Sequence, residues 1–173
     1  TFTGNLEGTA IVEPRHTNPA IVSVPSKLLT VVPGVAVSVS PESAPDGSGD
    51  VIQAQNVTAG NSITVYAVAR DAQGNFKGNV SADWHIINNS TPFITTTLNL
   101  TPTTNSTYTV FSGIVAGTAQ IRATSSSLTP EDSEVITTIP GEATRFDVML
   151  DESPDGSTVY MDTQRRFIIV ARD

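Results

Sequence analysis

The sequence predicts an all-β protein, and three observations lead to that prediction. Apolar and polar residues alternate with a period of two in several short segments, most clearly at 63–70, as in strands that bury one face. Turn residues separate these segments, and none of them has a helical period. Thr and Ser are abundant while only 15% of the residues are charged, a composition that favours strands over helices.

The sequence also repeats itself. Four segments recur later in the chain in the same order, with offsets of 109, 107, 109 and 102 residues. The matched pairs are FTGNLEGTA at 2–10 with FSGIVAGTA at 111–119, LTVVPG at 29–34 with ITTIPG at 136–141, SAPDGS at 43–48 with ESPDGS at 152–157, and VARD at 68–71 and 170–173. Such a series indicates tandem copies of one structural unit.

The repeat predicts a division of the chain into three parts. Residues 1–33 are expected to be the C-terminal part of one repeat, residues 34–140 a complete repeat, and residues 141–173 the N-terminal part of a third. Pro-Gly pairs that begin at Pro33 and Pro140 mark the joints, because proline cannot continue a sheet ladder and glycine turns freely. Linkers this short predict a stiff rod.

The complete repeat is expected to be an immunoglobulin-like β-sandwich. Strands are predicted at 35–40, 63–70, 82–87, 93–100, 107–111, 118–124 and 133–139. About seven short strands in about 107 residues is typical of such a sandwich, which often buries a tryptophan on its third strand, where Trp84 falls. Val65, Ala67 and Ala69 are expected to face the core, and Tyr66, Val68 and Arg70 to face outward.

The block at 62–75, which ends in Ala-Arg-Asp-Ala-Gln-Gly-Asn, resembles the bacterial Ig-like repeats of invasin- and intimin-type surface proteins. The segments 117–121 and 135–141 strengthen the likeness, which covers the middle repeat and both partial ones. The resemblance implies an extracellular, multi-domain stalk, adhesin, surface-layer protein or accessory region of a large secreted protein.

Composition excludes several functions. Cysteine is absent, so disulfides and thiolate chemistry are excluded. The net charge of −8 argues against a nucleic-acid partner, which needs clustered Lys and Arg. No run of about 18 apolar residues occurs, so no helical membrane span is expected.

Catalysis finds little support in the sequence, and we nominate no catalytic, cofactor-binding or metal-binding residue. The two histidines, His16 and His85, lie in different repeats, and both are interpreted as surface residues. No local motif combines a nucleophile with a base. The sequence therefore predicts a protein that is not an enzyme.

Calcium is an open alternative at two places. Asp46, Ser48 and Asp50 place oxygen side chains at positions one, three and five of a loop, but Val57 replaces the glutamate of an EF-hand at the twelfth position. The counterpart at 155–158 loses the last aspartate, and Asp-Gly-Ser is also ordinary turn sequence. Carboxylates near the joints, such as Asp71 and Glu142, could share an ion between repeats.

The sequence offers candidate sites for covalently attached glycans and for a bound carbohydrate. Six asparagines begin an Asn-x-Ser/Thr acceptor pattern, which also arises by chance in a Ser/Thr-rich chain. They are Asn56, Asn79, Asn88, Asn89, Asn99 and Asn105, and the Thr-rich segment 91–109 offers O-linked sites. Tyr66, Tyr108 and Tyr160 are the aromatic side chains available to stack on a bound sugar.

The leading hypothesis is a structural module, used as a stalk, fibre or surface-layer building block outside the cell, with neighbouring repeats or copies of itself as partners. The alternatives are an adhesive or carbohydrate-binding module, with a cell-surface protein or glycan as partner, and an accessory domain of a larger secreted enzyme. A recognition module predicts a contiguous exposed aromatic or apolar patch. Partial repeats leave unpaired strand edges, so we expect either a longer chain or completion by neighbouring copies, which the native mass distinguishes.

Overall fold

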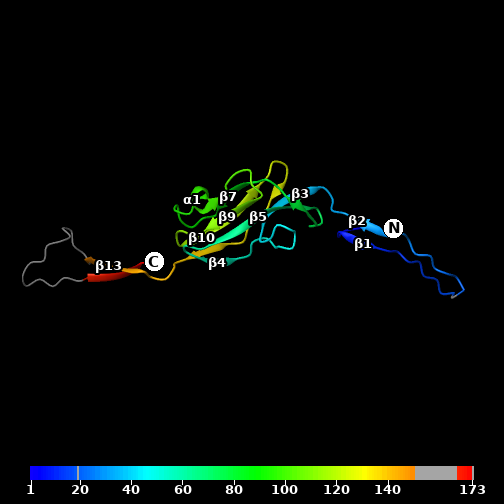
Figure 1. The fold of residues 1–173 in the computed structure, drawn as a ribbon, viewed down its shortest axis with the longest axis horizontal. Coiled ribbons are helices and arrows are strands. Elements are labelled where there is room, and N and C mark those ends of the chain that lie inside the picture. The colour runs from blue at the N-terminus through cyan, green and yellow to red at the C-terminus, as the bar shows by residue number, and fades with distance from the viewer. Residues whose placement is uncertain (19, 151–166, 173) are drawn as a thin grey trace, which may run out of the picture.

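The computed structural model describes residues 1–18, 20–150 and 167–172, and this part of the chain is nearly all β. Figure 1 shows a central body with a thin two-stranded ribbon at each end. Its elements are β1 (Gly8–Ala10), β2 (Leu29–Val31), β3 (Ala36–Glu42), β4 (Gln55–Thr58), β5 (Ser62–Asp71), β6 (Phe76–Asn79), β7 (Asp83–Ile87), α1 (Thr96–Asn99), β8 (Leu100–Thr101), β9 (Tyr108–Ser112), β10 (Gly117–Thr124), β11 (Thr129–Pro130), β12 (Ile136–Ile139), β13 (Arg145–Leu150) and β14 (Phe167–Arg172). No helix in the described ranges has the length and apolar character needed to cross a membrane.

The central body is a sandwich of two sheets. One sheet has the order β11-β3-β5-β9-β8, with β6 also paired to β5, and the other has the order β4-β12-β10-β7. Both sheets contribute to one core, which contains Val65 and Phe111 from the first sheet and Trp84, Ile121 and Ile136 from the second. Two facing sheets that share an apolar interior confirm the predicted all-β sandwich.

Strand β5 shows how far alternation predicts burial. Val65, Ala67 and Ala69 are buried, as their period of two predicts. Val68 was expected to face outward but is also buried. The segment between β3 and β4 folds back over this outer face, where Arg70 reaches the carbonyls of its loop, so the face is covered by protein at this point.

The strand predicted at 93–100 is wrong over most of its length. The chain there forms a turn and the short helix α1, and only β8 follows as strand. Asn99 accounts for the difference, because its side-chain oxygen accepts the Thr95 N–H at 3.0 Å while its own N–H donates to the Thr95 carbonyl at 3.0 Å. Such local hydrogen bonds compete with a sheet ladder.

The N-terminal ribbon, residues 1–32, repeats a strand pair of the sandwich. Its β1–β2 register is Gly8↔Val31, Thr9↔Thr30 and Ala10↔Leu29, and the β10–β12 register is Gly117↔Thr138, Thr118↔Thr137 and Ala119↔Ile136. Adding the sequence offsets of 109 and 107 residues to the first set gives the second, pair by pair. The ribbon therefore holds the same two strands in the same register.

The C-terminal ribbon, formed by β13 and β14, repeats a different pair. Arg145↔Arg172, Phe146↔Ala171 and Asp147↔Val170 correspond to Ser38↔Arg70, Val39↔Ala69 and Ser40↔Val68 in the β3–β5 pair. The offsets are 107 residues for the first strand and 102 for the second. The first offset is the one that relates Gly34 to Gly141 across the joints.

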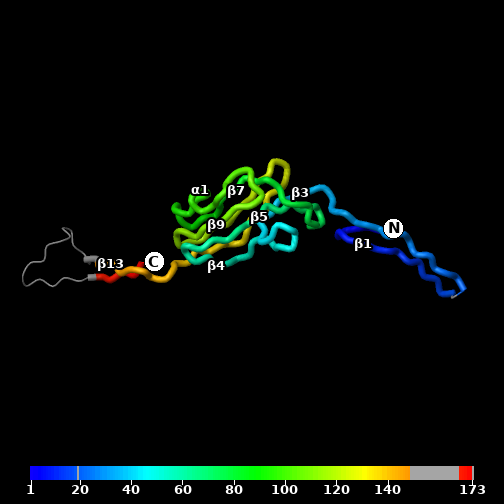
Figure 2. The backbone as a smooth tube through the Cα atoms, in the orientation of Figure 1, coloured from blue at the N-terminus to red at the C-terminus, as the bar shows by residue number. Residues whose placement is uncertain are grey.

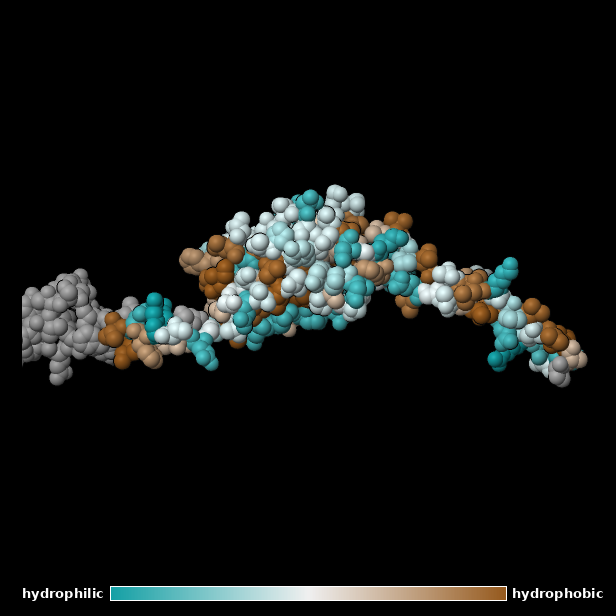
Figure 3. Space-filling view, viewed as in Figure 1, coloured by the Kyte–Doolittle hydropathy of each residue, from teal (hydrophilic) through white to brown (hydrophobic). Residues whose placement is uncertain are grey.

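The ribbons carry apolar residues that correspond to core positions. Phe146 is 72% exposed, whereas its counterpart Val39 is fully buried. Phe2 is 50% exposed, whereas its counterpart Phe111 is fully buried. Figure 3 shows such apolar residues along both ribbons, which have no second described sheet against them. Figure 2 shows that the backbone passes from the N-terminal ribbon into β3 without a long loop.

Candidate functional site

The candidate site is the turn between β5 and β6, residues 71–75, which we call the junction turn. The Asp71 N–H donates to the Asn75 carbonyl at 3.1 Å, and the Gly74 N–H donates to the Asp71 carbonyl at 3.0 Å. Gly74 has a φ of 82°, which glycine adopts without steric cost. The turn thus places Asp71 and Asn75 side by side at the end of the sandwich that faces the N-terminal ribbon (Figure 1).

The Asp71 carboxylate is surrounded by N–H donors. One oxygen accepts the Gly34 N–H at 2.7 Å and the Asn75 side-chain amide at 2.9 Å. The other oxygen accepts the Gln73 N–H at 3.0 Å, the Asn75 N–H at 2.9 Å and the Asn75 amide at 3.1 Å. The side-chain bond from Asn75, followed by the backbone bond from Gly34, lowers the pKa of Asp71 to about 2. The charged carboxylate therefore anchors the linker.

Asn75 continues this network into the N-terminal ribbon. Its Nδ2 donates to the Asn5 carbonyl at 3.1 Å, and its Oδ1 accepts the Glu7 N–H at 3.1 Å. Both contacts use ribbon backbone, so Asn75 pairs with this segment as a neighbouring strand would. The Lys77 ammonium lies 3.4 Å from the Pro33 carbonyl and adds a contact to the linker. The junction turn thus holds the ribbon at two points.

An ion pair between Arg70 and the buried Glu42 contacts the junction turn. The Arg70 guanidinium binds Glu42 through two bonds of 2.6 and 2.7 Å, and the Glu42 side chain is fully buried. Arg70 also donates to the Gly74 carbonyl at 2.8 Å and to the Gly47 and Gly49 carbonyls at 3.3 Å. The bond to Glu42 raises the pKa of Arg70. One guanidinium therefore connects β3, the loop after it and the junction turn.

A related pair lies on the C-terminal ribbon. Arg172, the counterpart of Arg70, has its Nε 3.2 Å from an oxygen of Asp147 on the neighbouring strand. This pair is more exposed than the Arg70 pair. The sequence signal that could have found both arginines is the recurrence of Val-Ala-Arg-Asp at 68–71 and 170–173.

The loop proposed for calcium has protein partners. One oxygen of Asp46 accepts the Ser48 N–H at 3.1 Å and the Ser48 hydroxyl at 2.6 Å, and these bonds lower the pKa of Asp46. The carbonyls of Gly47 and Gly49 accept from Arg70. The loop at 46–50 is therefore a turn that is closed by the Asp46–Ser48 bonds and whose carbonyls bind the Arg70 guanidinium. Its counterpart at 155–158 lies outside the described residues.

The two joint carboxylates lie at opposite ends of the sandwich. The Asp71 carboxylate accepts N–H groups of the junction turn and the linker, whereas Glu142 is exposed within the linker that leads to β13. The described residues contain no group of three or more His, Asp or Glu side chains arranged to hold a metal ion.

The two histidines lie in different parts of the fold, and neither belongs to the junction turn. His16 lies at the tip of the N-terminal ribbon, where its Nδ1 accepts the Asn18 N–H at 2.9 Å. His85 lies on β7, with its Nε2 3.2 Å from the Thr124 hydroxyl. Both side chains are exposed.

Two of the three tyrosines lie side by side. Tyr66 on β5 is directly opposite Tyr108 on β9 in the antiparallel register, and the Tyr108 side chain is 44% exposed. Tyr66 is half-buried. Directly opposed residues on one sheet face have neighbouring side chains, so these rings form a small aromatic surface. Tyr160 lies outside the described residues.

The six acceptor-pattern asparagines differ in access. Asn99 is buried, and its side-chain amide donates to the Ser112 carbonyl at 2.8 Å, so the folded sandwich hides it from a glycosylating enzyme. The other five are exposed: Asn56, Asn79, Asn88, Asn89 and Asn105.

Comparison with known proteins gives one distant likeness. No protein family matches the chain, and no curated protein sequence matches it. Among solved structures the chain is similar to surface layer protein SbsC, domains 4-9, with a TM-score of 0.38 and 14% identity. The likeness covers 96% of this chain and 24% of that one, so the chain spans about a quarter of its length. The comparisons do not show an invasin- or intimin-type family.

Proposed function

We propose that this chain is a structural, non-catalytic segment of a tandem array of Ig-like repeats, a stalk, fibre or surface-layer building block outside the cell. The observation that carries the proposal is the agreement of strand registers: both ribbons hold strand pairs of the sandwich at the offsets of the sequence repeat. Two unrelated segments have no physical reason to share such registers.

The division proposed from the sequence fits this arrangement. Residues 34–140 form the complete repeat, and every buried residue of the shared core lies between Val39 and Ile136. Residues 1–33 and 141–173 contribute strand pairs of the preceding and following repeats. Apolar residues at their core positions support this assignment, because the inner face of a sandwich sheet is apolar where a second sheet covers it.

A spacer must resist bending, and the junction turn supports that role. Linkers of a few residues already limit the angles between repeats. Asp71 binds the linker at Gly34, and Asn75 binds the ribbon at Asn5 and Glu7. Contacts at separate points restrict rotation as well as bending. The buried charges of this region thus have a structural role, which is a common alternative to catalysis for groups with shifted pKa values.

The test is to complete the third repeat. The chain is extended after Asp173, the sequence counterpart of Asp71, by a copy of residues 72–140. The parent has one tryptophan, Trp84, which is buried and donates its indole N–H to the Ser106 carbonyl at 3.1 Å. If the third part is a repeat, the copied tryptophan gives a second dispersed indole signal in the NMR spectrum. An indole signal at the position of an unfolded chain would contradict the proposal.

A second function, glycan binding, is favoured by the paired rings of Tyr66 and Tyr108. Aromatic faces stack on sugar rings. Titration with neutral oligosaccharides should then shift the amide signals of β5 and β9, and Tyr108→Ala should abolish these shifts. Unchanged amide signals at millimolar oligosaccharide would contradict glycan binding and leave the structural role as the remaining proposal.

A further inference from the structure

The side chains of the junction turn form hydrogen bonds with backbone atoms of the preceding segment. Asn75 binds the Asn5 carbonyl and the Glu7 N–H, and Asp71 binds the Gly34 N–H. Backbone contacts do not depend on the side chains at these positions. Any repeat with the same backbone shape can therefore present the same contact points.

Two of the three counterparts of these contact points lie together at the other end of the sandwich. The offsets of 109 and 107 residues convert Asn5, Glu7 and Gly34 into Ile114, Ala116 and Gly141. A hollow of about 460 Å³ lies there. Its lining contains two of the three counterparts, and the residues are Ala59, Gly60, Ile114, Gly141, Glu142 and Thr144.

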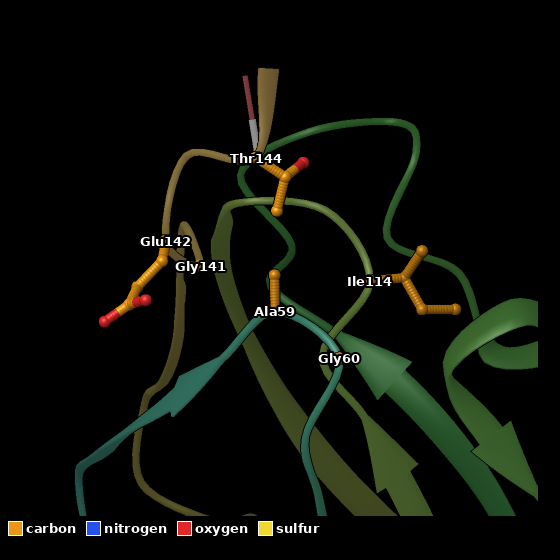
Figure 4. Close-up of a pocket in the computed structure, with 6 residues that line it drawn as sticks. All are labelled: Ala59, Gly60, Ile114, Gly141, Glu142 and Thr144. Carbon is orange, nitrogen blue, oxygen red and sulfur yellow. The ribbon is translucent and has the colours of Figure 1, made fainter. Parts of the chain in front are cut away.

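The hollow is open and lined by small groups where it meets the sandwich. Ala59 points its single methyl toward Thr144, while Ile114 and Glu142 lie on opposite sides (Figure 4). A Cβ added at Gly60 would meet no atom within 4 Å. Ile114 is 53% exposed although it is apolar. A polypeptide turn can therefore enter without displacing large side chains.

We propose that this hollow is the receiving surface for the junction turn of a following repeat of the same type. The inference rests on the proposed repeat array and identifies how adjacent repeats dock. The Asp of the incoming turn lies at the Gly141 linker, and its Asn, four residues later, pairs with the backbone at Ile114 and Ala116. The lysine that follows, equivalent to Lys77, comes to the linker beside Glu142, which adds charge complementarity.

The experiment uses the extended chain, residues 1–173 followed by a copy of residues 72–140, and residual dipolar couplings in an aligned medium. Docked repeats move as one body, so one alignment tensor should fit both sandwiches. Ala59→Arg places a long charged side chain in the hollow and should cause loss of the common tensor. Ala54→Arg is the matched control, because Ala54 is exposed at the other end of β4 and lies outside the hollow, and it should keep the common tensor.

A second variant alters the incoming junction turn instead of the hollow. Changing the copied Asn75 to Ala leaves the hollow intact and should also abolish the common tensor. Two dispersed indole signals in every variant show that both sandwiches are folded, which separates this test from that of the repeat array itself. A common tensor retained in Ala59→Arg and in the Asn variant would overturn the docking proposal, as would two tensors in the unaltered extended chain.

Discussion

Replacing Asn75 with alanine removes the side chain that joins the junction turn to the N-terminal ribbon. The change deletes the bonds to the Asn5 carbonyl and the Glu7 N–H, each 3.1 Å long. A hydrogen bond of this kind contributes about 0.5–1.5 kcal/mol net, so the docking of the ribbon weakens by about 1–3 kcal/mol, a roughly 5- to 150-fold change in its equilibrium. Asp71 keeps its three backbone N–H donors, so the turn itself should persist.

Amide hydrogen exchange at Glu7 measures this change directly, because that N–H is the donor to Asn75. We expect faster exchange at Glu7 in Asn75→Ala, by the same roughly 5- to 150-fold factor. Asn79→Ala is the control, since Asn79 is an exposed asparagine on the adjacent strand β6, and it should leave Glu7 unchanged. Equal exchange rates at Glu7 in Asn75→Ala and the parent chain would refute the role of Asn75 in the junction.

Two further predictions concern charge. Arg70→Met removes the arginine from the fully buried Glu42 and should lower the free energy of unfolding by about 3–5 kcal/mol. Arg122→Met breaks an ion pair of similar geometry whose side chains are 40% and 31% exposed, and it should cost much less, because solvent screens exposed ion pairs. Urea unfolding followed by Trp84 fluorescence compares the two variants, and equal costs would contradict the reasoning. The pKa of Asp71, about 2 rather than 3.8, means that its carboxylate contributes stability above pH 3.8 that is lost as the pH falls through about 2. The stability difference between the parent and Asp71→Asn should therefore narrow over that range in a urea series, and a constant difference would count against the carboxylate network.

Burial along a strand was predictable where one face of the strand packs against the core and the other face meets solvent. The period of two placed Val65, Ala67 and Ala69 in the core, as the structure confirms. Val68 was predicted to face outward and to be exposed, but it is buried. The loop after β3 reaches Arg70 on the same outer face, and such tertiary covering leaves no local signal in the sequence. The segment 93–100 was assigned to a strand, but the hydrogen bonds of Asn99 and Thr95 close a turn instead.

The candidate site was predictable only in part. Asp71 was named as a carboxylate near a joint, but the chemistry considered for it was calcium. The sequence could not reveal Asn75 as a bridge, because its contact with Asn5 joins residues that are 70 positions apart. The pairing of Arg70 with Glu42 was also missed, since Glu42 lies beyond the strand predicted at 35–40 and charged residues are ordinarily interpreted as surface residues.

The proposed spacer role requires a stiff connection between residues 1–33 and residues 34–140. Residual dipolar couplings of the parent chain test that connection most directly, because they report the orientation of each amide in a common frame. A single alignment tensor should fit the amides of β1 and β2 together with those of the sandwich. A separate, weaker tensor for β1 and β2 would show that the ribbon moves independently and would contradict the rigid junction.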